Sequence, residues 1–254
     1  MIGIGLQNYI GLGARSDAPA ASPPPTLDEL YLAGRDSFGT QVPDATTTIL
    51  GTVLSLQTAD MVAYSDGTLF RATIEKDEVA TGDSAGTERC EVESTPTLFF
   101  TIGSKSWMGV EFEAYIPAGV PVPGGTSSVV IAQMKFTTGD AIQILHHASG
   151  VIRLRRGTGG TNQLVASGSA RGQWHKFKIL GRWAKDTDGQ LVVSVDDADV
   201  VTLANAANVY PVSIADSERV YVKLGAYRAS GLTDESRGPV SVFFRNITIL
   251  TEAP

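Results

Sequence analysis

The chain has 254 residues, of which 43% are hydrophobic, and a formal net charge of −7 at pH 7. That hydrophobic content can fill a core and excludes a wholly disordered chain. The negative charge argues against general nucleic-acid binding, which needs a basic surface, although a local basic groove on an acidic body remains compatible with it.

The sparse cysteines and histidines indicate a chain without a metal site or cofactor. Cys90 is the only cysteine, so an intramolecular disulfide and a cysteine-rich metal site are both impossible. His146 and His147 would point to opposite faces of a strand, so we expect no shared metal between them. No apolar run approaches the roughly 20 residues of a transmembrane helix, so no membrane partner is expected.

Residues 1–34 predict an extended N-terminal arm with a Pro-rich linker and a short helix. The segment 13–26 is rich in Pro, Ala and Ser, which is typical of a linker. Thr26 and Glu29 have the spacing of a capping box, which predicts a short helix after Thr26.

The first residues of the arm are apolar but show no secretion signal, because a basic region is lacking. Such an arm suits docking into a larger assembly, and it loosely resembles the starts of some bacteriophage virion proteins. A disordered terminus is the alternative. Phage particles leave the cell by lysis and need no secretion signal, so we expect a virion component or an extracellular protein.

Residues 35–254 predict one all-β domain. Short alternating or apolar segments are separated by turn residues, and no long helical pattern interrupts them. The expected strands lie within 46–56, 67–74, 109–116, 128–136, 141–148, 150–157, 176–184, 190–197, 220–228 and 240–250. Asp188-Gly189 predicts a hairpin. The pattern favours a jelly-roll β-sandwich of the concanavalin A-like type.

Four segments alternate so that polar side chains share one face of each strand. These sets are Arg89, Glu91 and Glu93; Glu111, Glu113 and Tyr115; Gln133 and Lys135; and Tyr221, Lys223 and Tyr227. If the four strands are neighbours in one sheet, their polar faces merge into a concave ligand groove. The alternative is the ordinary solvated face of an antiparallel sheet.

Such a groove suits an acidic sugar chain. Arg and Lys pair with carboxylates, and Arg does so in bidentate fashion. Gln bonds hydroxyls or a carboxyl group, and Tyr stacks on sugar rings while offering its hydroxyl.

Several motifs resemble those of the jelly-roll polysaccharide lyases, the group of alginate, glucuronan and heparin I-type lyases. The stretch RCEVE resembles the R-x-E-L-R/E strand of that group, and IAQMKF lies where the group carries Q-x-H. YVKLGAYR resembles its Y-F-K-x-G-x-Y strand, and residues 172–200 resemble its Trp-containing strand and D-x-x-G hairpin. The resemblance covers the chain from about Asp36 to the C-terminus.

The resemblance implies β-elimination on a uronic acid, without a cofactor. Gln133 and Arg89 would neutralise the substrate carboxylate, and Tyr221 or Tyr227 would act as the acid or as acid and base. The residues expected to bind the substrate are Lys135, Lys223, Glu91, Arg228 and Tyr115. The implied partner is an acidic polysaccharide.

Lys135 departs from the group, because it stands where the group has its His. An ordinary lysine is protonated at pH 7 and is a poor base. A tyrosine can act as base alone where nearby cations stabilise the phenolate, and Lys135, Lys223 and Arg89 are candidates for that effect. Three hypotheses therefore remain open: a lyase, a carbohydrate-binding protein without catalysis, and a glycan-binding virion spike or fibre protein.

Overall fold

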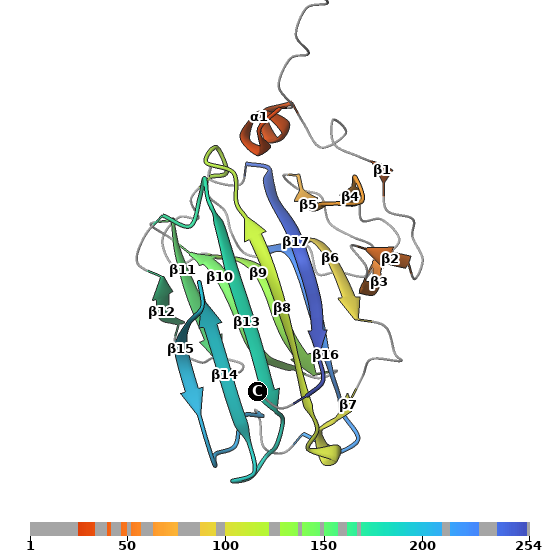
Figure 1. Ribbon diagram of the computed structural model, residues 1–254, viewed down its shortest axis with the longest axis vertical. Coiled ribbons are helices and arrows are strands. Elements are labelled where there is room, and N and C mark those ends of the chain that lie inside the picture. Colours follow the sequence, from red (N-terminus) through yellow and green to blue (C-terminus); the bar gives the residue numbers. More distant parts are fainter. Residues whose placement is uncertain are drawn as a thin grey trace, which may run out of the picture.

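Two antiparallel sheets form a sandwich in the part of the chain that the computed structural model describes (Figure 1). The described residues are 25–33, 40–41, 47–49, 52–56, 63–75, 87–94, 100–121, 128–136, 139–147, 150–156, 162–166, 169–209, 214–228 and 238–252.

The strand order in each sheet mixes early and late segments of the chain. The eight-stranded sheet contains, in order, β1 (Thr40–Gln41), β4 (Ala63–Ser65), β5 (Phe70–Ile74), β17 (Val240–Leu250), β8 (Trp107–Tyr115), β13 (Trp174–Arg182), β14 (Gln190–Val195) and β15 (Ala198–Leu203). The nine-stranded sheet contains β12 (Asn162–Ala166), β11 (Val151–Arg156), β10 (Gly139–His147), β9 (Ser128–Phe136), β16 (Arg219–Arg228), β6 (Glu88–Ser94), β3 (Thr52–Leu56) and β2 (Thr47–Ile49), with β7 (Phe100–Thr101) paired to β16. A 3₁₀ turn, η3 (Ile102–Ser104), follows β7.

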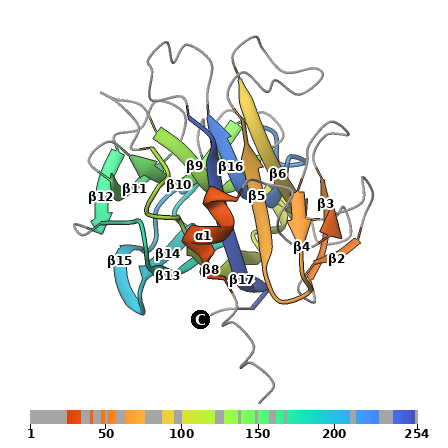
Figure 2. The same cartoon turned by 90° about the horizontal axis from the view of Figure 1, so that it is seen from above.

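The two sheets are separate layers when the molecule is seen from above (Figure 2). The last two strands lie inside the sheets, because β17 is inserted between β5 and β8, and β16 between β9 and β6. The all-β, jelly-roll prediction is confirmed by this architecture.

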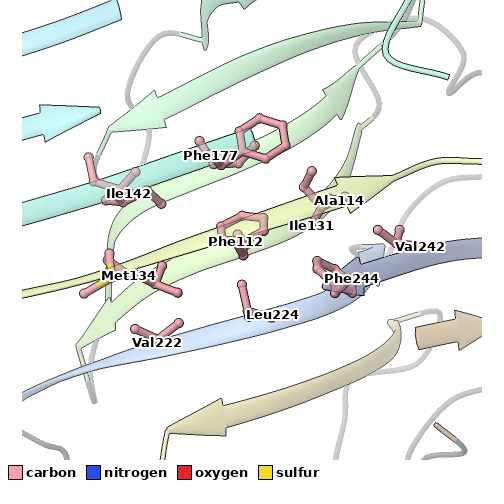
Figure 3. Close-up of a cluster of buried hydrophobic side chains, with 14 of the residues drawn as sticks. Phe112, Ala114, Ile131, Met134, Ile142, Phe177, Val222, Leu224, Val242 and Phe244 are labelled. Atoms are coloured by element: carbon pink, nitrogen blue, oxygen red, sulfur yellow. The ribbon is translucent and has the colours of Figure 1, made fainter. Parts of the chain in front are cut away.

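Apolar side chains from both sheets fill the space between the layers (Figure 3). The ring centroids of Phe112 on β8 and Phe177 on β13 are 5.2 Å apart, and Phe244 on β17 lies 5.9 Å from Phe112. Met134 and Leu224 face them from the nine-stranded sheet, and both are fully buried. Because strand side chains alternate, the same strands present their other residues on the outer faces.

The predicted strands all form at least part of a strand, and β13 and β14 make the expected hairpin around Asp188-Gly189. The strands that the prediction lacks include β1, β4, β7 and β12, which are short or lie at a sheet edge and therefore carry little periodic signal. Among the described residues, no helix is long and apolar enough to span a membrane.

Helix α1 (Leu27–Leu32) lies against the outer face of the eight-stranded sheet. Its capping box is present as expected, with reciprocal bonds between Thr26 and Glu29. Asp28 accepts a hydrogen bond from the Tyr115 hydroxyl at 3.1 Å, which ties the helix to β8. Residues 1–24 lie outside the described residues, so the extended arm and its boundary at residue 34 stay predictions.

Candidate functional site

Strands β6, β16 and β9 merge their polar sets on the side of the nine-stranded sheet that faces away from the core. We call this side the polar face. The paired residues on it are Tyr221 with Lys135, Lys223 with Gln133 and with Glu93, and Tyr227 with Arg89. Directly paired residues of an antiparallel ladder point to the same side. The alternate residues of β16, Val222, Leu224 and Ala226, are buried in the core.

Each tyrosine of β16 lies beside a cation. The guanidinium carbon of Arg89 is 4.9 Å from the ring centroid of Tyr227, and the Lys223 ammonium is 5.7 Å from that of Tyr221. A cation near an aromatic face is attracted by the ring quadrupole. The side chain of Arg89 is 17% exposed. An anionic ligand can therefore reach the guanidinium beside the Tyr227 ring.

A buried carboxylate and amide lie beside these pairs. Glu91 is 1% exposed and Gln133 is 4% exposed, and the Gln133 side-chain NH₂ donates to Glu91 Oε1 at 2.5 Å. Burial raises the pKa of Glu91, while Lys223, the bond from Gln133, and Arg89 oppose that rise. Neighbouring atoms therefore cover this carboxylate, which the open surface of a sheet would leave exposed.

Lys223 is as deeply buried as core residues, at 2% exposed. Its ammonium lies 3.8 Å from Glu93 Oε2. Burial lowers the pKa of Lys223 below its ordinary value, and the neighbouring Glu91 and Glu93 oppose that fall only in part. The ammonium is thus surrounded by the two carboxylates and the Tyr221 ring, and its expected role in holding a substrate stays a prediction.

Gly225 allows β16 to approach β6 closely. A Cβ at this position would lie 2.1 Å from the carbonyl oxygen of Cys90, and the φ angle is 155°. The pairing of β16 with β9 is irregular at the same place, between Leu224 and Tyr227. Glycine is thus required between Lys223 and Tyr227, which explains why the polar set of YVKLGAYR has a gap at its third position.

The polar face continues over β10 and β11, which the sequence reasoning did not include. Gln143 lies opposite Gln133 and Arg155, and its NH₂ donates to Gln133 Oε1 at 3.2 Å. Arg155 donates in turn to Gln143 Oε1. Strand alternation could have found these residues, because Arg153 and Arg155 alternate with the core residues Ile152 and Leu154.

The polar face is locally cationic on an acidic chain. Among the described side chains of β6, β9, β10, β11 and β16, alternation places six cations on this side, Arg89, Lys135, Arg153, Arg155, Arg219 and Lys223. The carboxylates among these described side chains on the same side are Glu91 and Glu93. A local positive field of this kind attracts an anionic polymer despite the net charge.

Tyr115 lies elsewhere, and the expectation that it lines the same face is wrong. Its strand β8 belongs to the eight-stranded sheet, where Tyr115 pairs with Trp174 and Phe243. It is 9% exposed and packs with Leu27 and Leu30 of α1. Glu111 and Glu113 lie on that same outer face. The polar residues of β8 therefore do not join those of β6, β9 and β16.

Arg228 also points away from the polar face, which corrects its predicted contact with the ligand there. It follows Tyr227 and therefore has the opposite orientation. The Arg228 side chain is 3% exposed, its Nε donates to Glu88 Oε2 at 2.5 Å, and its Nη1 donates to the Gly238 carbonyl at 3.0 Å. A buried pair of this kind holds β16 to β6 on the core side.

Residues 40–248 match the family model described as polysaccharide lyase. The chain belongs to the polysaccharide lyase family. No curated protein matches the chain.

Solved lyase structures share the fold of this polysaccharide lyase family member. An alginate lyase of polysaccharide lyase family 7 has a TM-score of 0.57 at 15% identity, over 82% of this chain and 93% of that chain. An alginate lyase from Corynebacterium sp. has a TM-score of 0.55 at 15% identity, over 76% and 81%. The endo-β-1,4-glucuronan lyase from the fungus Trichoderma reesei has 0.54 at 15% identity, over 85% and 93%. At these identities the likeness shows the fold alone.

In this family member, Lys135 is half-buried and lies opposite Tyr221 in the ladder. It is two residues from Gln133 on the same face, and its correspondence to the His of the jelly-roll group stays a prediction. Burial raises the pKa of both Glu91 and Glu93, and the charge of Lys135 is among the effects that oppose this rise. The described residues include no group of three or more His, Cys, Asp or Glu that could hold a metal ion.

Proposed function

We propose that this chain binds a uronate-containing polysaccharide on the polar face, and that it cleaves the polymer only slowly by β-elimination. The observation that carries the proposal is the Arg89–Tyr227 pair, in which a partly exposed guanidinium and a phenol lie 4.9 Å apart. The guanidinium suits a carboxylate, and the phenol suits the sugar ring and its oxygens.

The local charge supports an acidic ligand over a neutral one. The cations of β6, β9, β11 and β16 outnumber the carboxylates on the described part of the polar face. The solved relatives with this fold are named as alginate and glucuronan lyases, which is consistent with an acidic polysaccharide.

In β-elimination, a base removes the C5 proton of the uronate, the C4–O bond breaks, and a C4=C5 double bond forms. The leaving oxygen takes up a proton from an acid. Arg89 and Gln133 would neutralise the carboxylate, and Tyr221 or Tyr227 would transfer the protons. We expect a slow reaction because Lys135 supplies an ammonium where a base is needed, and general base catalysis typically contributes about 10²–10⁴-fold.

The experiment measures binding and cleavage with the same polymers. Alginate, glucuronan and heparin are each titrated into the protein in a calorimeter, and the ultraviolet absorbance of the unsaturated uronate product is followed in parallel. Binding with slow product formation supports the proposal. Turnover as fast as that of ordinary lyases would overturn the slow-cleavage part, and absence of binding at every salt concentration would overturn all of it.

The virion hypothesis and the expected extracellular location have no structural support here. Both rest on the N-terminal residues, and 1–24 lie outside the described residues. Docking of the arm to a virus particle therefore stays a prediction, and it is compatible with glycan binding by the domain.

A further inference from the structure

Four side chains form a continuous hydrogen-bond chain across the polar face. Arg155 on β11 donates through Nη2 to Gln143 Oε1 on β10. Gln143 Nε2 donates to Gln133 Oε1 on β9 at 3.2 Å, and Gln133 Nε2 donates to Glu91 Oε1 on β6 at 2.5 Å. β16 lies between β9 and β6, so the last bond passes across that strand.

The donor-to-acceptor direction of these hydrogen bonds is fixed by the two end residues, Arg155 and Glu91. A guanidinium has only donors, so Gln143 must turn its oxygen toward Arg155 and its NH₂ toward Gln133. Gln133 must then turn its oxygen toward Gln143 and its NH₂ toward Glu91, which accepts. A flip of either amide would set two donors or two acceptors against each other in a buried place.

The fixed direction decides what Gln133 presents to a ligand. Its NH₂ bonds Oε1 of Glu91, and Nη1 of Arg89 lies 4.0 Å from Oε2 of the same carboxylate, so both donors lie around Glu91. One N–H of Gln133 remains after the bond to Glu91. A carboxylate held by Arg89 therefore approaches a donor of Gln133. The buried amide is not free to turn its oxygen outward for a hydroxyl, because Gln133 and Gln143 are 4% and 1% exposed.

We infer that Gln143 and Arg155 are positioning residues that hold the Gln133 amide as a hydrogen-bond donor, and that they thereby select a uronate carboxylate over a neutral hydroxymethyl group on the same sugar carbon. The inference rests on the proposed function and extends it to two residues that do not contact the carboxylate themselves.

The ligand pair for the test differs only in that group. β-1,4-Linked glucuronate oligomers and cello-oligosaccharides of equal length have the same linkage and ring, with a carboxylate or a CH₂OH at C5. The ratio of their dissociation constants, measured by calorimetry on the full chain, reports the selectivity.

The main variant is Gln143→Met, which keeps length and charge and removes both hydrogen-bonding groups. It should reduce the selectivity ratio about tenfold, the size expected when one bond to a charged group is lost. Arg155→Gln should reduce the ratio further than Arg153→Gln does, because both remove one charge from β11 but only Arg155 ends the chain of bonds. Arg155→Lys keeps a charged donor and should recover part of the loss.

A second readout needs no glycan. The side-chain NH₂ signals of Gln133 in a ¹⁵N-labelled sample, assigned by their loss in Gln133→Ala, should shift in Gln143→Met while signals of the eight-stranded sheet stay in place. Unchanged Gln133 signals would overturn the inference whatever the glycan result.

The outcomes separate the inference from the proposed function. If the wild-type protein binds the glucuronate oligomer and Gln143→Met leaves the ratio unchanged, the inference fails and the proposed function stands. If the wild-type protein binds no acidic glycan, the proposed function fails and the selectivity fails with it. An equal loss of selectivity in Arg155→Gln and Arg153→Gln would show that Arg155 acts only through its charge, and it would overturn the positioning role.

Discussion

Arg89 and Tyr227 face each other across the β6–β16 ladder, with the guanidinium carbon 4.9 Å from the ring centroid. The pair places a guanidinium, which can bind a carboxylate, beside a phenol, which can transfer a proton. Its position depends on two segments that are far apart in the sequence, and β16 brings them together by pairing with β6.

Arg89→Ala should weaken binding of an acidic glycan about 10- to 100-fold, because a hydrogen bond between charged groups is worth roughly 1.5–3 kcal/mol. The loss should be larger at low salt, where the attraction is screened least. Titration calorimetry at two ionic strengths measures both effects. Arg89→Lys is the matched control, since it keeps the charge and loses the bidentate geometry. Equal affinity of Arg89→Ala and wild type would remove Arg89 from the site.

Lys135→His should raise any residual elimination rate. A neutral imidazole can accept the C5 proton, and general base catalysis typically contributes about 10²–10⁴-fold. The rate of unsaturated product formation from alginate or glucuronan measures the effect.

Tyr227→Phe and Tyr221→Phe made in the Lys135→His background identify the tyrosine that protonates the leaving oxygen. Fast wild-type turnover that either tyrosine change abolishes, with no effect of substitution at Lys135, would show that tyrosine alone carries the proton transfers.

Gly225→Ala should destabilise the fold by at least about 2 kcal/mol, because the added methyl group meets the backbone of β6 and the strands must move apart. The Cβ would lie 2.1 Å from the Cys90 oxygen. Gly67→Ala is the control, since Gly67 has a φ of 88° with nothing within 4 Å of its Cβ. Gly67→Ala should lower the free energy of unfolding only by the cost of placing alanine at a positive φ, about 1–2 kcal/mol. Urea unfolding compares the two, and equal losses would contradict the steric argument.

His146 should make the fold sensitive to acid. It is 1% exposed, neither ring nitrogen has a hydrogen-bond partner among the described residues, and burial lowers its pKa to about 4, with Arg171 and His147 adding to the effect. The unfolded chain takes up a proton near the ordinary pKa of about 6.5, and the folded chain does so only near 4. Stability should therefore fall as the pH drops from 6.5 to 4, by about 3 kcal/mol at 1.36 kcal/mol per pKa unit.

His146→Leu should flatten that part of the stability profile, because the side chain no longer titrates. The free energy of unfolding from urea titrations at several pH values between 4 and 7 measures the difference. The same acid slope in both proteins would assign the sensitivity to other groups.

Tyr115→Phe should leave glycan affinity unchanged, since Tyr115 lies on the other sheet. The lost hydrogen bond to Asp28 should cost about 1 kcal/mol of stability, because it ties α1 to β8. Calorimetric titration and urea unfolding of the same sample check both parts. Weaker glycan binding in this variant would show that the outer face of the eight-stranded sheet also takes part.

The sequence by itself determined the long strands and, within a regular stretch of strand, which residues share a face. Alternation is a local property with a period of two residues, so Gln133 and Lys135, or Tyr221, Lys223 and Tyr227, can be assigned to one side without a structure. The capping box of Thr26 and Glu29 is equally local. The motif stretches also carried enough pattern to indicate the polysaccharide lyase family, which the match over residues 40–248 confirms.

Only the tertiary structure decided which strands are neighbours. β8 alternates like β6, but it pairs with β17 and β13, so its Tyr115 and the polar face lie on different sheets. β10 and β11 extend the polar face beyond β9, which brought Gln143 into contact with Gln133 and Arg155 into contact with Gln143. Strand pairing depends on contacts between segments that are distant in sequence, and no local period encodes it. The burial and the hydrogen bonds of the site residues therefore became visible only in the folded chain.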